Sequence, residues 1–358
     1  MKSIYRPSIL KISLIFLFFL LNIKCSGISY KNNNDKFAIT YNNPPVVKLI
    51  ELSPYISRGG SAVIIFKVED GDVDSVFIQY KNGEKYFPSP FLKNNYYIGF
   101  LSYPLTADSF NAIIIAKDTA GNCSTNFFSI PQKKVIYPKR KIAIRENFSI
   151  AKIDELKLDK ANLPSSDMEI HNLIMKSFSE KRAIDIKAET SKPRTNFIKK
   201  IEINNFKPMK DFRITSPFGE RRLFMLKNKV ARESYHYGVD LANSKNTEIF
   251  TSNDGEVIFA GYNGASGNTI IIHHGLGLYS TYFHCSEIYV KAGENIKAGQ
   301  LIARSGDTGY ALGDHLHFGI IVSGTSVNPE EWMNPEWITN NIISPIQKAD
   351  STINKEQN

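Results

Sequence analysis

Between about residues 205 and 335 the chain consists of short β-type runs separated by frequent glycines, with almost no helical periodicity. Runs of β-branched and aromatic residues predict strands, and glycine predicts the turns between them because it accepts positive φ at no steric cost. The runs fall at residues 256–260, 269–273, 278–283, 301–303 and 316–322. This pattern restricts residues 205–335 to an all-β domain.

A second set of short β-type runs lies in residues 45–136, at 62–68, 73–80 and 112–117. Asn82-Gly83 lies between two such runs and predicts a hairpin, because both residues tolerate positive φ. Asp118-Thr-Ala-Gly121 predicts another turn. Several strands at this spacing favour a small antiparallel sandwich. The segment resembles the immunoglobulin-like modules of bacterial surface proteins, so the whole chain is predicted to be mainly β.

Residues 137–204 are more polar and charged, and they predict a partly helical linker between the two β units. Ser166 and Glu169 have the spacing of a capping box, and apolar residues follow at helical spacing. We therefore expect a short amphipathic helix to start at Ser166, with His171 on its surface. Residues 336–358 are expected to form a polar C-terminal tail that is frayed from about residue 340.

Residues 1–25 indicate an export signal. A positively charged n-region precedes residues 12–23, which are almost wholly apolar. That run is shorter than the roughly 20 residues of a membrane span and suits a signal peptide. Cys25 ends a loose lipoprotein processing box with Lys24 where a small residue is usual, so a lipid on Cys25, cleavage near Ser26 and an uncleaved anchor all stay open. Residues 26–44 are expected to be a tether, and the protein is expected in the periplasm or cell envelope, with the signal or a lipid as a membrane anchor.

The net charge of +9 fits contact with an acidic surface, such as an anionic envelope polymer. The basic residues are scattered, so no nucleic-acid partner is expected. Cys25, Cys123 and Cys285 lie far apart in different predicted units, which argues against a disulfide framework. The sequence does not indicate an oligomeric state.

Six of the seven histidines lie between His236 and His317. Histidine is the commonest protein ligand for metals and carries protons near neutral pH. In His315-Leu-His317 the two imidazoles would project from one face of a strand, because residues i and i+2 share a face, and Leu316 would point to the other. One histidine of this pair could bind a metal while its neighbour handles the substrate.

His236 and Asp240 would supply the missing ligands, and Gly238 between them permits a sharp bend. Two histidines and one carboxylate leave the fourth tetrahedral position on zinc open, which is the catalytic arrangement. A water molecule there becomes a nucleophile near neutral pH. His284 adds a further imidazole, so His284 and His315 could share proton transfer and oxyanion stabilisation.

Three neighbouring residues are expected to have no chemical role. His273 and His274 precede a probable turn and are interpreted as strand-end residues. Strand alternation turns Cys285 away from the site, which favours a place in the core.

Six motifs of this region are Ser216-Pro-Phe-Gly-Glu-Arg221, His236-Tyr-Gly-Val-Asp240, His273-His-Gly275, Tyr282-Phe-His284, Ser305-Gly-Asp-Thr-Gly309 and His315-Leu-His-Phe318. In content and order they resemble the lysostaphin-like, LytM-type zinc endopeptidases of bacterial cell walls, over about 130 residues. The resemblance implies a small two-sheet β fold with a groove, and a peptide cross-link of peptidoglycan as substrate. It implies Zn²⁺ bound by His236, Asp240 and His317, with His284 and His315 as catalytic histidines beside the zinc water. Three departures from the family pattern remove no ligand: Cys285, Asp314 and Gly319.

The sequence therefore predicts an exported zinc endopeptidase that hydrolyses peptide cross-links of bacterial peptidoglycan, positioned at the wall by the sandwich and linker. One alternative is a non-catalytic envelope protein that regulates another cell-wall hydrolase, which the complete ligand set disfavours. The other is a surface adhesin whose β modules bind a host or envelope partner.

Overall fold

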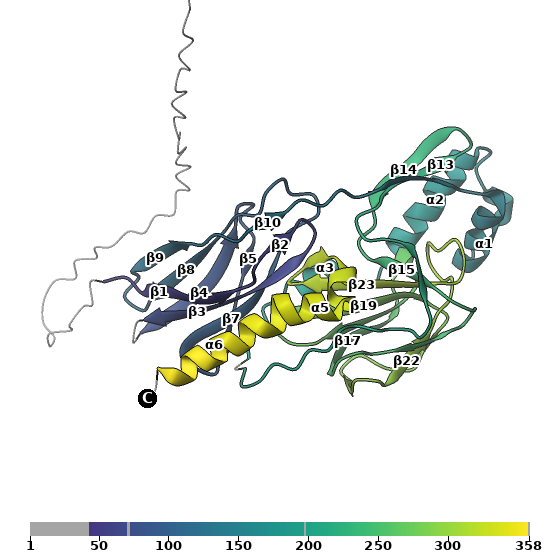
Figure 1. The fold of residues 1–358 in the computed structure, drawn as a ribbon. Helices are drawn as coiled ribbons and strands as arrows, with labels where there is room; N and C mark the ends of the chain where they lie inside the picture. Colours follow the sequence, from purple (N-terminus) through teal and green to yellow (C-terminus); the bar gives the residue numbers. More distant parts are fainter. Residues whose placement is uncertain (1–42, 70–71, 197, 357–358) are drawn as a thin grey trace, which may run out of the picture.

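A computed structural model of the chain describes residues 43–69, 72–196 and 198–356 (Figure 1). The predicted signal, Cys25 and nearly all of the predicted tether lie outside these ranges. Within them, no helix is both long and apolar enough to span a bilayer. The prediction of a mainly β chain is confirmed.

The N-terminal unit consists of two antiparallel sheets that face each other. One has the order β1-β3-β7-β6 and the other β5-β4-β8-β9. The strands are β1 (Val46–Leu52), β3 (Ser61–Glu69), β4 (Val73–Tyr80), β5 (Lys85–Tyr86), β6 (Ser89–Phe91), β7 (Lys93–Ser102), β8 (Ala112–Asp118) and β9 (Cys123–Phe127), with β2 (Ile56–Ser57) paired to β10 (Gln132–Lys133) beside them. Gly83 and Gly121 both have positive φ, as the two predicted turns require. The immunoglobulin-like character of this unit stays a prediction.

Strand β3 is apolar along most of its length rather than alternating, because both of its faces are buried. Ile64 and Phe66 pack in the core between the two N-terminal sheets. Val63 and Ile65, on the other face, belong to a core that continues into the C-terminal domain. A strand covered on both sides needs apolar residues at every position.

The connecting segment is more structured than the sequence predicts. It contains β11 (Lys139–Ala143), α1 (Glu146–Leu156), the 3₁₀ turn η1 (Lys160–Asn162), α2 (Asp167–Glu180) and α3 (Ile186–Thr190). The predicted helix is confirmed as α2, whose N-cap Ser166 accepts a hydrogen bond from the Glu169 N–H. The surface position expected for His171 is wrong: it is 1% exposed. Its ring lies 6.0 Å from that of Tyr310, in the interface between α2 and the C-terminal domain.

The C-terminal domain is built on an eight-stranded sheet whose main path runs β12-β15-β23-β19-β18-β17-β21, with β24 paired to β23. These strands are β12 (Arg213–Ser216), β15 (Val239–Ala242), β17 (Gly255–Tyr262), β18 (Asn268–His273), β19 (Leu278–Cys285), β21 (Asn295–Ile296), β23 (Leu316–Val322) and β24 (Thr325–Val327). A smaller sheet joins β16 (Glu248–Phe250), β22 (Leu301–Arg304) and β20 (Glu287–Ile288). A third joins β11 of the connecting segment to β13 (Arg221–Leu226) and β14 (Lys229–Tyr235), and the turn η2 (Gly264–Ser266) precedes β18. The predicted all-β domain is confirmed.

The frayed C-terminal tail is a wrong prediction. After α4 (Pro329–Met333) and α5 (Pro335–Ile338), the π-helical turn η3 (Thr339–Ile343) leads into α6 (Ser344–Lys355). Helix α6 lies along the N-terminal sheet (Figure 1) and buries Ala349 and Ile353 in the shared core. The spacing of four residues between these two places them on one helix face. The tail therefore joins the two β units.

Candidate active site

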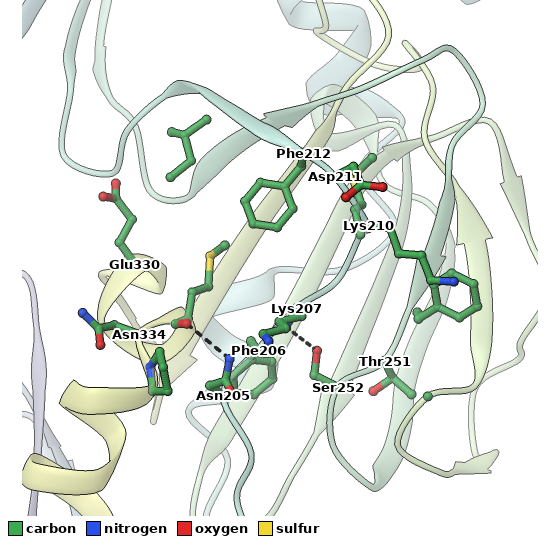
Figure 2. Close-up of a pocket in the computed structure, with 16 residues that line it drawn as sticks. Asn205, Phe206, Lys207, Lys210, Asp211, Phe212, Thr251, Ser252, Glu330 and Asn334 are labelled. Atoms are coloured by element: carbon green, nitrogen blue, oxygen red, sulfur yellow. Dashed lines mark hydrogen bonds between the residues drawn. The ribbon is translucent and has the colours of Figure 1, made fainter.

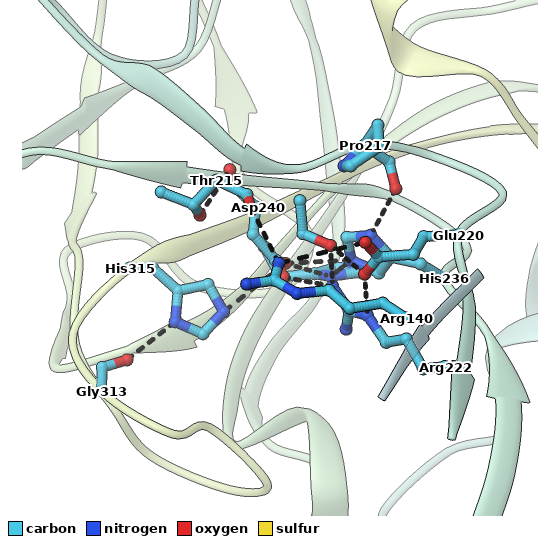
Figure 3. Close-up of polar contacts among 11 residues, drawn as sticks. Arg140, Thr215, Pro217, Glu220, Arg222, His236, Asp240, Gly313 and His315 are labelled. Carbon is cyan, nitrogen blue, oxygen red and sulfur yellow. Dashed lines mark hydrogen bonds and ion pairs between the residues drawn. The ribbon is translucent and has the colours of Figure 1, made fainter. Parts of the chain in front are cut away.

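The sheet brings the three predicted metal ligands together. Asp240 lies on β15 directly opposite His317 on β23, and His236 lies in the loop before β15. Figure 3 shows Asp240 and His236 among their polar contacts. Asp240 Oδ1 is 2.9 Å from His236 Nε2 and 3.1 Å from His317 Nδ1. The two imidazole nitrogens are 2.9 Å apart. Three potential ligand atoms thus converge on one point.

Hydrogen bonds outside this cluster orient two of the ligands. His236 Nδ1 lies 2.8 Å from the carbonyl oxygen of Pro217. Because a carbonyl only accepts, Nδ1 carries the proton and Nε2 presents its lone pair to the cluster. Arg222 donates to Asp240 Oδ2 over 2.5 Å, which leaves Oδ1 facing the two imidazoles. Arg222 and Pro217 were not among the predicted site residues, although both lie in or beside the motif Ser216-Pro-Phe-Gly-Glu-Arg221.

The geometry suits a zinc ion. Zinc–ligand bonds of about 2.0–2.1 Å in a tetrahedron place neighbouring ligand atoms about 3.4 Å apart. The three separations of 2.9–3.1 Å would need to open by only a few tenths of an ångström. Two nitrogens and one carboxylate oxygen are the donor set of a catalytic site with one open position.

Gly238 serves this site for a reason other than the one predicted. Its φ is not in the positive region, so no sharp glycine-dependent bend joins His236 to Asp240. Instead, a Cβ at this position would lie 2.4 Å from His317 Nε2 and 2.6 Å from the backbone oxygen of Phe318. Glycine is needed because the imidazole of His317 occupies the space where a side chain would be.

His315 and His317 share one face as predicted. Both lie near Asp240, and Leu316 between them is fully buried on the opposite side. His315 Nδ1 is 2.7 Å from the Gly313 carbonyl oxygen, so this nitrogen donates and Nε2 is the nitrogen that faces Asp240. That Nε2 lies 3.5 Å from Asp240 Oδ1.

A β-bulge places His284 in the site. The pairing of β18 with β19 shifts register between Asn268 and Ile270, and His284 has φ of +66°. Left-handed backbone is unfavourable for a residue with a side chain and typically marks a functional position. His284 Nδ1 donates to the Thr308 carbonyl oxygen over 2.8 Å. Its ring centroid lies 5.0 Å from that of His315, so the two predicted catalytic histidines face the same space.

Burial and hydrogen bonding set the protonation states. Burial alone would raise the pKa of Asp240, but its close contacts with the imidazoles of His236, His315 and His317 hold it well below its usual range. Burial lowers the pKa of His317 to about 4, against the opposing effect of Asp240. Burial, aided by the charge of His315, also lowers the pKa of His284. For His315, burial opposes protonation, but the carboxylate of Asp240 outweighs it and raises the pKa. A carboxylate beside neutral imidazole is the state that binds a divalent cation.

The site opens into a groove of about 480 Å³. The connecting segment forms one wall through β11, and the loop that ends at His315 forms another. The first wall is basic, and Arg140 reaches the Thr215 carbonyl oxygen at 3.3 Å (Figure 3). Lys141 and Arg145 also line it, and neither forms an ion pair with any residue that the structure describes.

A larger hollow of about 1130 Å³ lies elsewhere, between β12 and the α4–α5 turn (Figure 2). None of the five predicted site residues lines it. The residues expected to have no chemical role are also apart from the groove. Cys285 is fully buried in the core, and His274 bonds to the Asp254 carbonyl oxygen and the Ser280 hydroxyl.

Residues 234–329 match the model of Peptidase family M23. The matched segment, called the M23 domain below, lies within the C-terminal domain. The M23 domain contains all five predicted site residues, and the relationship predicted from the six motifs is confirmed.

The curated relatives each match about a third of the chain. Peptidoglycan DD-endopeptidase ShyA of Vibrio cholerae is 40% identical over 117 residues, which cover 33% of this chain and 26% of that protein. DD-carboxypeptidase/endopeptidase Mpg of Neisseria meningitidis is 35% identical over 125 residues, covering 35% and 28%. A solved zinc-containing peptidase from Vibrio cholerae is 32% identical with a TM-score of 0.33, covering 37% of this chain and 40% of that one. The chain thus spans about a quarter of the length of the curated relatives it matches.

Proposed function

We propose that the protein is a zinc-dependent endopeptidase that hydrolyses peptide cross-links of bacterial peptidoglycan. One observation carries the proposal: ligand atoms of His236, Asp240 and His317 lie within 4.8 Å of one another beside a groove. His284 and His315 flank the cluster without belonging to it. This arrangement separates the groups that would hold a metal from the groups that would move protons.

The residues divide the chemistry as follows. A bound zinc ion would supply Lewis acidity and lower the pKa of a coordinated water molecule to near neutrality. In both His284 and His315, Nδ1 donates to a backbone carbonyl, which leaves Nε2 available for proton transfer, and both residues line the groove. An imidazole fixed in this way can take up a proton and can donate a hydrogen bond to a developing oxyanion. Arg222 keeps Asp240 in its ligating orientation.

The substrate class follows from the relatives and from charge. ShyA and Mpg carry names that identify them as peptidoglycan or peptide-bond hydrolases, and each matches about a third of this chain. The basic wall of Arg140, Lys141 and Arg145 suits a polymer that carries free carboxylates. The export signal predicted in residues 1–25 would bring the protein to that polymer, and a lipid on Cys25 or an uncleaved signal would hold it at a membrane. The N-terminal sandwich would then position the groove at the wall.

The test uses the full chain on purified peptidoglycan sacculi. Zinc-loaded protein should release soluble fragments, a chelator should stop the release, and added zinc should restore it. His317→Ala should abolish cleavage and zinc binding while circular dichroism stays native. His273→Gln, a histidine outside the groove, is the matched control and should cleave normally. Mass spectrometry of the fragments identifies the bond that is cut. Failure of folded, zinc-loaded protein to release any fragment would refute the proposal and favour the non-catalytic regulator.

A further inference from the structure

Helix α1 of the connecting segment holds the loop that supports His284. Glu155 Oε1 accepts hydrogen bonds from the Gly309 N–H at 2.6 Å and from the Tyr262 hydroxyl at 2.9 Å. Its other oxygen pairs with Lys152 Nζ at 2.8 Å. Lys152 also donates to the Asp307 carbonyl oxygen over 2.7 Å. The Glu155–Lys152 ion pair therefore forms hydrogen bonds with the backbone of Asp307 and of Gly309, the residues on either side of Thr308.

The group that binds His284 and the group that binds Glu155 belong to a single peptide unit. The Thr308 carbonyl, which accepts from His284 Nδ1, and the Gly309 N–H, which donates to Glu155, share one planar amide. An amide cannot turn its carbonyl without turning its N–H. Glu155 therefore fixes the direction of the acceptor that fixes His284. A carboxylate on the N–H also polarises the amide and strengthens its carbonyl as an acceptor, because hydrogen bonds in a chain reinforce one another.

Burial indicates that the contact between α1 and the loop at residues 307–309 is an ordered part of the fold and not a chance surface contact. Lys152 is 4% exposed, which is rare for lysine unless its charge is paired. Tyr310, the next residue of the loop after Gly309, anchors the helices. Its ring packs against Phe148 of α1 at 5.0 Å and Phe178 of α2 at 6.4 Å. Helix α1 is thus held against the loop by an apolar cluster as well as by the ion pair.

We propose that Glu155, supported by Lys152, is a positioning residue for His284 and acts through the Thr308–Gly309 peptide. This inference rests on the proposed function and adds to it. The residue that orients one catalytic histidine comes from the connecting helix, outside the segment that matches the M23 model. The Glu155 carboxylate accepts from the Gly309 N–H, and the Thr308 carbonyl of the same peptide accepts from His284 Nδ1–H. This arrangement leaves His284 Nε2 without a backbone partner among the described residues, available to the groove.

The competing explanation is that the hydrogen bonds of Glu155 only stabilise the fold and do not orient His284. The side chain of Thr308 is independently held, because its hydroxyl donates to the Cys285 carbonyl and accepts from the Asn268 N–H, each at 2.9 Å. If those bonds suffice, loss of Glu155 would lower stability and leave His284 unchanged. Two variants separate charge from shape. Glu155→Gln keeps an oxygen acceptor for Gly309 but loses the charge, and Glu155→Ala removes both.

The first measurement needs no activity. In the metal-free protein, imidazole ¹H–¹⁵N spectra should show the Nδ1–H of His284 as a downfield, slowly exchanging proton, assigned by its loss in His284→Ala. Glu155→Gln should move this proton upfield, and Glu155→Ala should broaden or remove it. Glu180→Gln, which removes a carboxylate from an exposed pair with Lys176 on α2, is the matched control and should change nothing.

The second measurement is cleavage of sacculus-derived peptides well below the melting temperature. We expect kcat to fall about 10-fold in Glu155→Gln and up to about 100-fold in Glu155→Ala, the range for residues that orient a functional group. KM and zinc content should stay near the wild-type values. Wild-type kcat together with an unmoved His284 proton in both variants would overturn the inference, whatever their melting temperatures. Absence of cleavage by wild-type protein would count against the proposed function instead, and the spectra would still decide the role of Glu155.

Discussion

Replacing Gly238 with alanine adds a single methyl group, but we expect it to weaken zinc binding at the proposed metal site. The new Cβ would lie 2.4 Å from His317 Nε2 and 2.6 Å from the Phe318 backbone oxygen, whereas real Cβ contacts stay above 3.0 Å and usually above 3.4 Å. The strands must therefore separate by 0.4 Å (3.0 − 2.6) to 0.8 Å (3.4 − 2.6). Val239 and Phe318 are paired across β15 and β23, so the oxygen cannot retreat without moving the ladder that carries Asp240 and His317. Zinc–ligand distances tolerate only about 0.2 Å.

We expect Gly238→Ala to bind zinc at least about 10-fold more weakly and to lose about 1–3 kcal/mol of stability through overpacking. Competition against a chromophoric chelator measures the affinity, and urea unfolding of the metal-free protein measures the stability. Gly313→Ala is the control, because a Cβ there has no atom within 4 Å although the residue lies beside His315. Wild-type zinc affinity in Gly238→Ala would refute the argument that this glycine makes room for His317.

Three further predictions test the surroundings of the site. Arg222→Met should weaken zinc binding about 10-fold by releasing Asp240, whereas Arg221→Met, on the exposed neighbour, should not; equal affinities in the two variants would contradict the role of Arg222. Arg140→Glu should raise KM for acidic wall peptides with little change in kcat, and a KM no higher than that of Lys139→Glu would exclude the basic wall as a substrate contact. Burial at the junction of the two units raises the pKa of Glu331 to about 7, above its ordinary value of 4.5. Because the folded protein keeps this proton longer than the unfolded chain, stability should fall by about 3 kcal/mol as pH rises from about 4.5 to about 7. Glu331→Gln should flatten that part of the pH–stability curve, and an unchanged slope would show that Glu331 titrates normally.

The three candidate metal ligands could be proposed from the sequence because histidine and aspartate commonly bind metals and occur here at a suitable local spacing. Two histidines separated by one apolar residue in a strand must share a face, and the fully buried Leu316 shows that they do. The partnership of Asp240 with His317 is different. It depends on the antiparallel register of β15 and β23, which are far apart in the chain. Only the resemblance to known endopeptidases selected His317 over His315.

The position of His284 could not be derived from strand alternation. A regular strand would place it on the same side as Tyr282, which is buried in the core. The bulge against β18 and the left-handed backbone at His284 break this alternation and turn the imidazole to the groove. A bulge is a property of two paired strands, so one strand's sequence does not reveal it.

The missed helices share a physical cause. Helix α1 buries a lysine on its inner face, and α6 is polar over most of its length, with only Pro345, Ala349 and Ile353 buried along one face. Their stability comes from contacts with distant parts of the chain, such as the Lys152 bond to the loop at Asp307. Tertiary packing supplies most of the stability of such short helices.

The residues proposed to carry the chemistry and the residues that orient them lie in different parts of the chain. All five predicted site residues lie within the segment 234–329 that matches the M23 model. The groups that direct them include Pro217 and Arg222, and Glu155 under the inference above, which lie before that segment. A hydrogen bond acts over about 3 Å and does not depend on which part of a chain supplies the partner. Relatives that match over the same segment can therefore share the metal ligands and still differ in the groups that orient them. Under the inference above, the connecting helix supplies one such group, so a movement of α1 would change the orientation of His284 through the Thr308–Gly309 peptide.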